Sequence, residues 1–319
     1  MKKTLVAIAA LAIVGAASAQ STVTLTGAYA FGYESSHSAA GVSAGGFGTD
    51  TAGMRLTATE DLGGGMSASA YISAGGLVRG SAVGGEDAAL AFTGGFGKIT
   101  LSSFESGHGL IPRASAGAPG YGLDGKVFSA NSNIDLVGWS SASMGGATFG
   151  VTYADRGGAT SNGLAAGTSG VAFAQPSIGV SVSYANGPVD ARVDYTSWTR
   201  RGDVTVAGSV LQSRVRLSGN YNLGVAKVGL GYSTLSRTTG VTTNETMAGL
   251  SAPVGAVTLG GTWGRSVSTG SALTRSGYTL GASYDLSKRT NIGASYFNWS
   301  TATVAGNNTG ARVLVAHSF

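Results

Sequence analysis

Apolar and polar residues alternate with a period of two along most of this chain, and helical periodicity is missing. In one segment Val228, Leu230 and Tyr232 alternate with Gly229 and Gly231. The segments 23–33 and 214–221 repeat the pattern. Because successive side chains of a strand point to opposite faces, the pattern predicts an all-β fold whose strands carry one apolar face and one small or polar face.

Composition indicates what these apolar faces contact. Charged residues make up 11% of the chain, against roughly 25% in typical globular domains, and glycine contributes 54 residues. Cysteine is absent, and beyond residue 19 no stretch is apolar enough for a membrane helix. In lipid only helices and closed barrels pair every backbone polar group, so we expect a transmembrane β-barrel with lipid outside and water inside. A soluble β-sandwich is the alternative at this point.

The first nineteen residues carry the pattern of a cleaved signal peptide. Lys2 and Lys3 precede an apolar stretch, and Ala17-Ser18-Ala19 is a small-residue cleavage motif. The apolar run 5–17 has 13 residues, fewer than the ~18 to 20 that span a bilayer, which disfavours a membrane anchor. We therefore expect residues 1–19 to be removed on export and residues 20–319 to form one barrel domain.

Short connections alternate with longer ones along the chain. Short turns rich in Gly, Asn and Pro are expected at residues 60–65, 94–97, 144–146, 186–188, 222–224, 252–255 and 285–291. Longer polar loops are expected at residues 37–48, 156–170 and 200–209. Short turns at one rim and long loops at the other are typical of bacterial outer-membrane barrels, whereas a sandwich gives no reason for this sorting.

Sixteen strands are expected, enough to enclose an aqueous lumen. Their predicted starts are Thr22, Thr49, Met66, Glu86, Gly97, Asn131, Gly146, Ala174, Val189, Leu211, Val225, Asn244, Ala256, Thr274, Asn291 and Gly310. An even number returns both ends of the chain to one rim. Aromatic residues near the predicted strand ends indicate two interfacial bands, one with Tyr184, Tyr221 and Tyr284, the other with Tyr33, Tyr153, Trp198, Tyr232, Trp263 and Trp299.

Charge and histidine content argue against nucleic-acid binding and against catalysis. Removing Lys2 and Lys3 from the 20 basic residues leaves 18 against 15 acidic ones, too small an excess to indicate nucleic acid. His37, His108 and His317 have no Ser or Asp at a recognisable motif spacing, and no His/Asp/Glu cluster suggests a metal. We expect no enzyme activity, no cofactor and no metal. A non-conducting structural or adhesion barrel is the alternative, and a plugged lumen would distinguish it.

Several short runs, in this order and at this spacing, resemble the trimeric Gram-negative porins, most closely the betaproteobacterial branch. The runs lie at residues 21–27 (STVTLTG), 59–65 (TEDLGGG), 94–97 (GGFG), 131–134 (NSNI), 284–290 (YDLSKRT) and 317–319 (HSF). The run at 284–290 is the most specific of them. Together they extend over the whole chain beyond residue 20.

The resemblance implies a homotrimer of 16-stranded barrels in the outer membrane, in contact with membrane lipid and lipopolysaccharide. It implies short periplasmic turns and a third loop, here residues 105–130, folded inward to narrow the pore. Phe319 would be the terminal signal that the barrel-assembly machinery reads. Such a protein is a passive diffusion channel for ions and small hydrophilic solutes.

The same resemblance, together with the alternation of faces, predicts which residues line the pore. On the inward loop, the acids Glu105 and Asp124 are joined by His108, Arg113 and Lys126. On the wall, the lumen-facing positions carry Arg55, Arg192, Arg214, Arg216 and Arg275. Lys98, Lys227 and Arg312 are expected nearer the periplasmic rim, and the expected lumen acids are Asp87, Asp135, Asp190 and Asp194. The basic excess predicts a weak anion preference, which Arg55 would support and Glu105 would oppose.

Two departures from the family concern the constriction. The strand expected at 86–93 has no arginine, and the loop lacks the Pro-Glu-Phe-Gly motif of enterobacterial porins.

The alternation also assigns Leu230 and Leu280 to the lipid face and Gly229 and Gly281 to the lumen, where we expect an arginine to be accommodated.

Overall fold

The computed structural model describes residues 21–78, 83–129, 132–155, 176–199, 211–269, 274–300 and 307–319. The leader expected at residues 1–19 and the loops expected at 156–170 and 200–209 lie outside these ranges. Among the described residues, no helix is long and apolar enough to cross a membrane.

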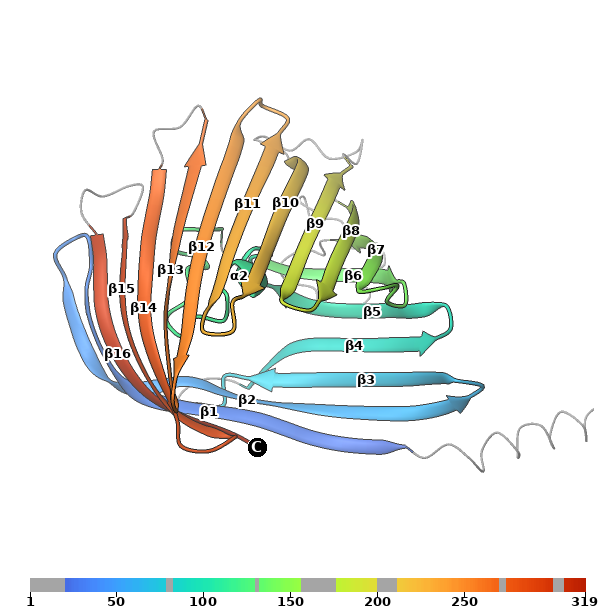
Figure 1. Ribbon diagram of the computed structural model, residues 1–319, viewed down its shortest axis with the longest axis horizontal. Coiled ribbons are helices and arrows are strands. Elements are labelled where there is room, and N and C mark those ends of the chain that lie inside the picture. Colours follow the sequence, from blue (N-terminus) through green and yellow to red (C-terminus); the bar gives the residue numbers. More distant parts are fainter. Residues whose placement is uncertain are drawn as a thin grey trace, which may run out of the picture.

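The described strands form one closed antiparallel barrel of sixteen, in which each strand pairs with its neighbours in sequence and β1 closes on β16 (Figure 1). The strands are β1 (Thr22–His37), β2 (Ser43–Gly63), β3 (Met66–Gly75), β4 (Gly84–Gly94), β5 (Gly97–Ser106), β6 (Ser132–Ser140), β7 (Ala147–Asp155), β8 (Ser177–Asn186), β9 (Val189–Trp198), β10 (Leu211–Asn222), β11 (Lys227–Arg237), β12 (Thr242–Val254), β13 (Val257–Ser268), β14 (Thr274–Asp285), β15 (Thr290–Ser300) and β16 (Asn307–Ser318). The expected sixteen-stranded barrel is confirmed.

The alternation of faces is visible in the exposure of single side chains. On β11, Leu230 is 70% exposed and Tyr232 is 48% exposed, while Gly229, Gly231 and Ser233 on the other face are buried. The large exposed apolar side chains of the other strands follow the same rule. A ring of strands with its apolar residues outside and its small and polar residues inside matches the predicted pattern.

Most connections agree with the expected lengths, and the first hairpin does not. Glycines with positive φ close the short turns at one rim, among them Gly145, Gly187, Gly224 and Gly255. At the other rim, β2 begins at Ser43 rather than at Thr49, because β1 and β2 stay paired as far as His37 opposite Ser43. The loop expected at 37–48 is therefore mostly strand, and loop length is sorted less strictly than predicted.

Two aromatic residues assigned to the outer bands point inward instead. Trp198 shares the lumen face of β9 with Arg192 and Asp194, and the guanidinium of Arg214 lies 5.6 Å from its ring centroid. Trp299 shares the lumen face of β15 with the buried Phe297. The remaining members of the bands, such as Tyr153 at 47% and Trp263 at 42%, are exposed on the outside.

Candidate functional site: the loop-crossed lumen

The connection between β5 and β6 folds into the barrel, as the resemblance implied. It contains the short helix α2 (Ile111–Ala114), which contacts β10, β11 and β12. The apolar side chains of this connection form a buried cluster with Met247 of β12. The loop members of that cluster are Leu110, Ala114, Leu123, Val127 and Phe128. Burial of these side chains holds the loop against one side of the lumen.

A buried contact between a histidine and a carboxylate and two further polar contacts fix the first half of the loop. His108 Nε2 lies 2.8 Å from Glu245 Oε2 on β12, and both side chains are almost fully buried. The imidazole stacks on Phe128 with ring centroids 4.5 Å apart. Arg113 Nε donates to Asp190 Oδ1 on β9 at 2.7 Å, and Ser251 Oγ donates to the carbonyl of Ala116 at 2.6 Å.

An aromatic and cationic cluster fixes the second half of the loop. The Tyr121 ring lies 4.7 Å from that of Phe297 and 5.7 Å from that of Trp299. Lys126 Nζ and the Arg312 guanidinium each lie 4.4 Å from the centroid of Tyr121. Arg312 therefore lies at the height of the inward loop, paired with Glu34 of β1 in the sheet register. The expectation that it lies nearer the periplasmic rim than the wall arginines is wrong.

Burial shifts the acid–base behaviour of this half of the loop. Burial raises the pKa of the Asp124 carboxyl, and the charge of His108, the backbone N–H of His108 and Lys126 oppose this rise. Burial lowers the pKa of the Lys126 ammonium, while Asp124 acts in the opposite direction. Lys126 also donates to the backbone carbonyl of Asp124 at 3.3 Å.

Three of the predicted wall arginines gather on β9 and β10, close to Arg113 of the loop. Arg192 and Arg216 both approach Asp194, at 3.5 and 3.7 Å. Arg214 lies on the same face of β10 as Arg216, opposite the exposed Val215. With Arg113 bound to Asp190, the described part of this basic face has four guanidinium groups and three carboxylates, those of Asp190, Asp194 and Glu245.

The opposite side of the lumen carries more carboxylates than expected, because two β-bulges change which face an acidic residue occupies. In the β1–β2 pairing Asp50 has no partner residue, and its carboxylate turns inward to bind Arg312 Nη1 at 2.6 Å. In the β3–β4 pairing Glu86 and Asp87 both stand opposite Ser73. Asp87 binds Arg55 Nη2 at 3.5 Å.

Glu86 also faces inward, since its carboxylate occupies the space in front of Gly75, a buried residue on the lumen face of β3. Arg55 itself lies 4.0 Å from the ring centroid of Tyr71. Glu34, Asp50, Glu86 and Asp87 thus form an acidic face, beside which the described part of the chain places Arg55, Arg312 and, from the loop, Lys126. Strict alternation would have placed Asp50 and Glu86 outside, and nothing in either strand alone reveals the bulge.

Two predicted lumen acids lie on the other face of the wall. Glu105 belongs to β5 rather than to the loop, and it shares the outer face with the exposed Ile99 and Leu101. Only its backbone N–H reaches the lumen side, where it donates to Asp87 Oδ1 at 3.0 Å. Asp135 is exposed and alternates on β6 with Val137 and Trp139, both of which are exposed outside.

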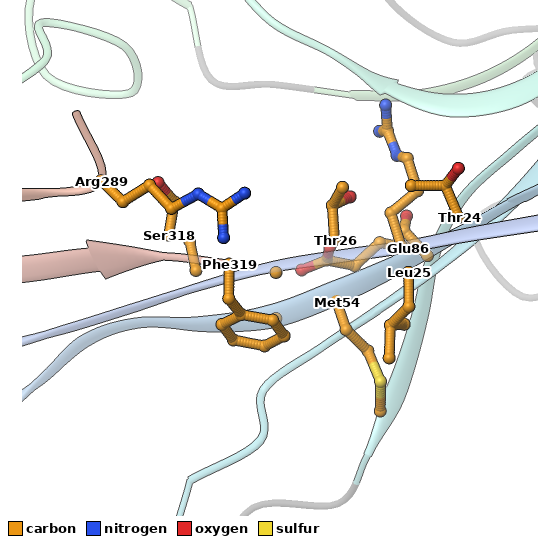
Figure 2. A pocket seen from close by; sticks show the side chains of 13 residues that line it. Thr24, Leu25, Thr26, Met54, Glu86, Arg289, Ser318 and Phe319 are labelled. Carbon is orange, nitrogen blue, oxygen red and sulfur yellow. The ribbon is translucent and has the colours of Figure 1, made fainter.

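Arg275 and Phe319 lie where the alternation and the terminal motif predict them. Arg275 is on the lumen face of β14, opposite the exposed Tyr278 and Leu280. Phe319 pairs through its backbone with Gly27, and its side chain is 49% exposed. Beside it is a recess of about 700 Å³. Figure 2 shows Leu25, Met54 and Phe319 directed to one side of the wall, with Thr24 and Thr26 directed to the other.

Within the described residues no three His, Asp or Glu side chains are grouped so as to hold a metal ion. What the geometry defines is a transmembrane β-barrel with an apolar outside and a charged lumen narrowed by an inserted loop. This is the architecture of an outer-membrane channel.

Comparison with known proteins identifies the family. A model described as Gram-negative porin matches residues 4–299. The outer membrane porin protein 32 of Delftia acidovorans is 31% identical over 300 aligned residues, which cover 81% of this chain and 77% of that protein. An anion-selective porin from Comamonas acidovorans has a similar structure, with a TM-score of 0.73 and 24% identity over 94% of this chain and 100% of that one. The trimer form of OmpT from Vibrio cholerae has a TM-score of 0.68 and 12% identity over 94% of this chain and 99% of its own.

The chain therefore belongs to the Gram-negative porin family, as the sequence motifs indicated, and it is a channel-forming protein of the cell outer membrane.

Proposed function

We propose that this porin is a passive diffusion channel for ions and small hydrophilic solutes, with a weak preference for anions. The observation that carries this proposal is the basic face, where among the described residues the four guanidinium groups of Arg113, Arg192, Arg214 and Arg216 stand against three carboxylates, those of Asp190, Asp194 and Glu245. Fixed positive charge in a narrow lumen raises the local concentration of anions. The structurally similar porin from Comamonas acidovorans is anion-selective.

The preference should be weak, because the acidic face opposes the basic one. Glu34, Asp50, Glu86 and Asp87 stand against Arg55 and Arg312. With Glu245 counted, the two faces carry six guanidinium groups and seven carboxylates, so the basic excess comes from Arg275 on β14 and from Lys98 and Lys227 on the lumen faces of β5 and β11. A solute in transit would pass between a basic and an acidic side.

The proposed diffusion function can be tested by solute permeation into vesicles that contain the reconstituted protein. Vesicles containing the protein should swell at rates that fall as the size of a neutral sugar increases, with no need for an energy source. A small dicarboxylate should enter faster than a diamine of equal size. Absence of swelling with every solute would favour a closed structural barrel, the other reading of the sequence, and would refute the proposal.

We further propose a homotrimer with an export signal at residues 1–19 and an assembly signal at Phe319. Trimeric relatives such as OmpT support the first point. The protein should migrate in dodecyl sulfate as a heat-labile trimer and, after boiling, as a single band near 30 kDa. Mass spectrometry of the mature protein should find Gln20 at its N-terminus. Lipopolysaccharide and the barrel-assembly machinery would be its partners in the membrane, and deletion of Phe319 should slow assembly. A monomer at all temperatures would contradict the trimer.

The family and the fold are those of channels rather than of enzymes. We propose that this chain has no catalytic activity of its own. His108 is engaged with Glu245 and stacked on Phe128, which leaves it no access to a substrate. A panel of lipase, esterase and protease substrates should therefore be left intact by the purified trimer.

A further inference from the structure

Glycines on the lumen face of the wall line up beneath the inward loop. They come from four adjacent strands, Gly229 and Gly231 from β11, Gly249 from β12, Gly260 and Gly264 from β13, and Gly281 from β14. Each lies on the inner face, as the exposed Leu230, Leu250, Leu259 and Leu280 on the outer face of the same strands establish. We call these six residues the glycine seat.

No side chain of the wall separates the loop from the glycine seat: loop backbone lies against Gly229, Gly249 and Gly281, and small or apolar loop side chains lie against the other three glycines. A Cβ on Gly229 would lie 2.6 Å from the carbonyl oxygen of Ala114 and 2.7 Å from that of Arg113. A Cβ on Gly260 would lie 2.9 Å from both Ala118 Cβ and Pro119 Cδ. Residues 113–119 thus cross from β11 to β14 in direct contact with the backbone of the wall, because the glycines present no side chain there.

We propose that the glycine seat sets the aperture of the pore. The loop occupies the lumen, so every ångström by which it stands off the wall is taken from the open passage on its other side. The wall cannot retreat, because it is a closed hydrogen-bonded ring. The loop cannot slide away, because Arg113 is tied to Asp190 and Tyr121 to the β15–β16 aromatic cluster.

The seat also explains why two lumen positions do not accept a large side chain. An arginine at Gly229 would meet the carbonyls of Arg113 and Ala114, and one at Gly281 would overlap Pro119. The expectation that both positions would tolerate arginine is therefore wrong for this loop arrangement. The inner face of the wall is not uniform, and only part of it borders open water.

Alanine and valine at Gly229 test the proposal, with the same two substitutions at Gly293 as matched controls. Gly293 faces the lumen from β15, and nothing lies closer than 4.0 Å to its Cβ position. Ordinary contact begins near 3.4 Å, so alanine at Gly229 lifts the loop by about 1 Å. We expect single-channel conductance in 1 M KCl, where charge effects are screened, to fall by on the order of a fifth with alanine and further with valine. The size limit for neutral sugars should fall in parallel.

Equal conductance in the Gly229 and Gly293 variants would overturn the proposal, as would a rise in conductance at Gly229. The inference rests on the channel function proposed above. The two proposals can be refuted separately. A native protein that does not conduct refutes the channel function, whereas Gly229 and Gly293 variants that conduct equally refute only the role of the glycine seat.

A crosslink provides a second test if the Gly229 variants do not fold. The chain contains no cysteine, so the double variant Ala114→Cys and Gly231→Cys has a clean background. The two Cβ positions are 2.9 Å apart, and a disulfide needs ~3.8 Å, which a lift of about 1 Å provides. Oxidation of the folded trimer should close the bond in most molecules. Failure to crosslink in folded protein would mean that the loop does not rest on β11.

Discussion

An arginine on the lipid face should destabilise the barrel far more than an arginine on an open part of the lumen face. Leu280 is 55% exposed on the outer face of β14 and lies five residues before the end of that strand at Asp285. Five residues at ~3.4 Å, tilted by ~45°, place it about 12 Å above the turn, half the height of a ~25 Å apolar band. Leu280→Arg should therefore cost the midplane value of about 2–4 kcal/mol.

Equilibrium unfolding by urea in phospholipid vesicles measures this cost. Leu280→Ala separates the lost apolar contact from the added charge, and Gly293→Arg places the same charge on the lumen side, where the Cβ has open space. We expect Leu280→Arg to shift the folding equilibrium about 30- to 1,000-fold, which is the same 2–4 kcal/mol, and Gly293→Arg to shift it little. If both arginines were equally damaging, the assignment of the two faces would be refuted.

Three further predictions concern the lumen. Among the charged residues that line the lumen, Arg55→Ala should weaken the anion preference and Glu86→Gln should strengthen it. Glu105→Ala should leave the reversal potential unchanged, because Glu105 points outward. A shift in reversal potential with Glu105→Ala alone would refute the bulge assignment. At the buried contact, Glu245→Ala leaves the imidazole of His108 without its hydrogen-bond partner, at a cost of about 1–3 kcal/mol. Limited proteolysis should then cut within residues 107–129, which stay protected in the native protein. In the loop, the raised pKa of Asp124 means that its ionised carboxylate destabilises the folded state. This destabilisation is present above the folded pKa and is lost as pH falls below the unfolded pKa. Asp124→Asn should therefore stabilise the protein against urea at pH 7 and not at pH 3, and equal effects at the two pH values would contradict this.

The alternation of residues was sufficient to predict the barrel, the number of strands and the face of most side chains. Arg192, Arg214, Arg216 and Arg275 all lie on the predicted inner face. The period of two is imposed by the backbone geometry of each strand, so it can be read from one strand at a time.

Features that depend on how strands pair could not be read in this way. The bulges that turn Asp50 and Glu86 inward arise from the register between neighbouring strands. Glu105 was assigned to the loop because the loop was expected to begin at residue 105, whereas β5 continues to Ser106, so that the loop begins two residues later. The sequence did not predict the glycine seat, because a glycine has no side chain from which its face can be recognised. The contacts of these glycines become visible when the loop is in place against the wall.

The zero-current potential across a bilayer containing the purified trimer tests the central claim most directly. With KCl at about 0.1 M on one side and a tenfold lower concentration on the other, screening in the lumen is weak. The account predicts steady currents whose reversal potential has the sign of chloride permeation, and an anion preference that fades as both solutions are raised toward 1 M. A reversal potential with the sign of potassium permeation, or the absence of current, would contradict it.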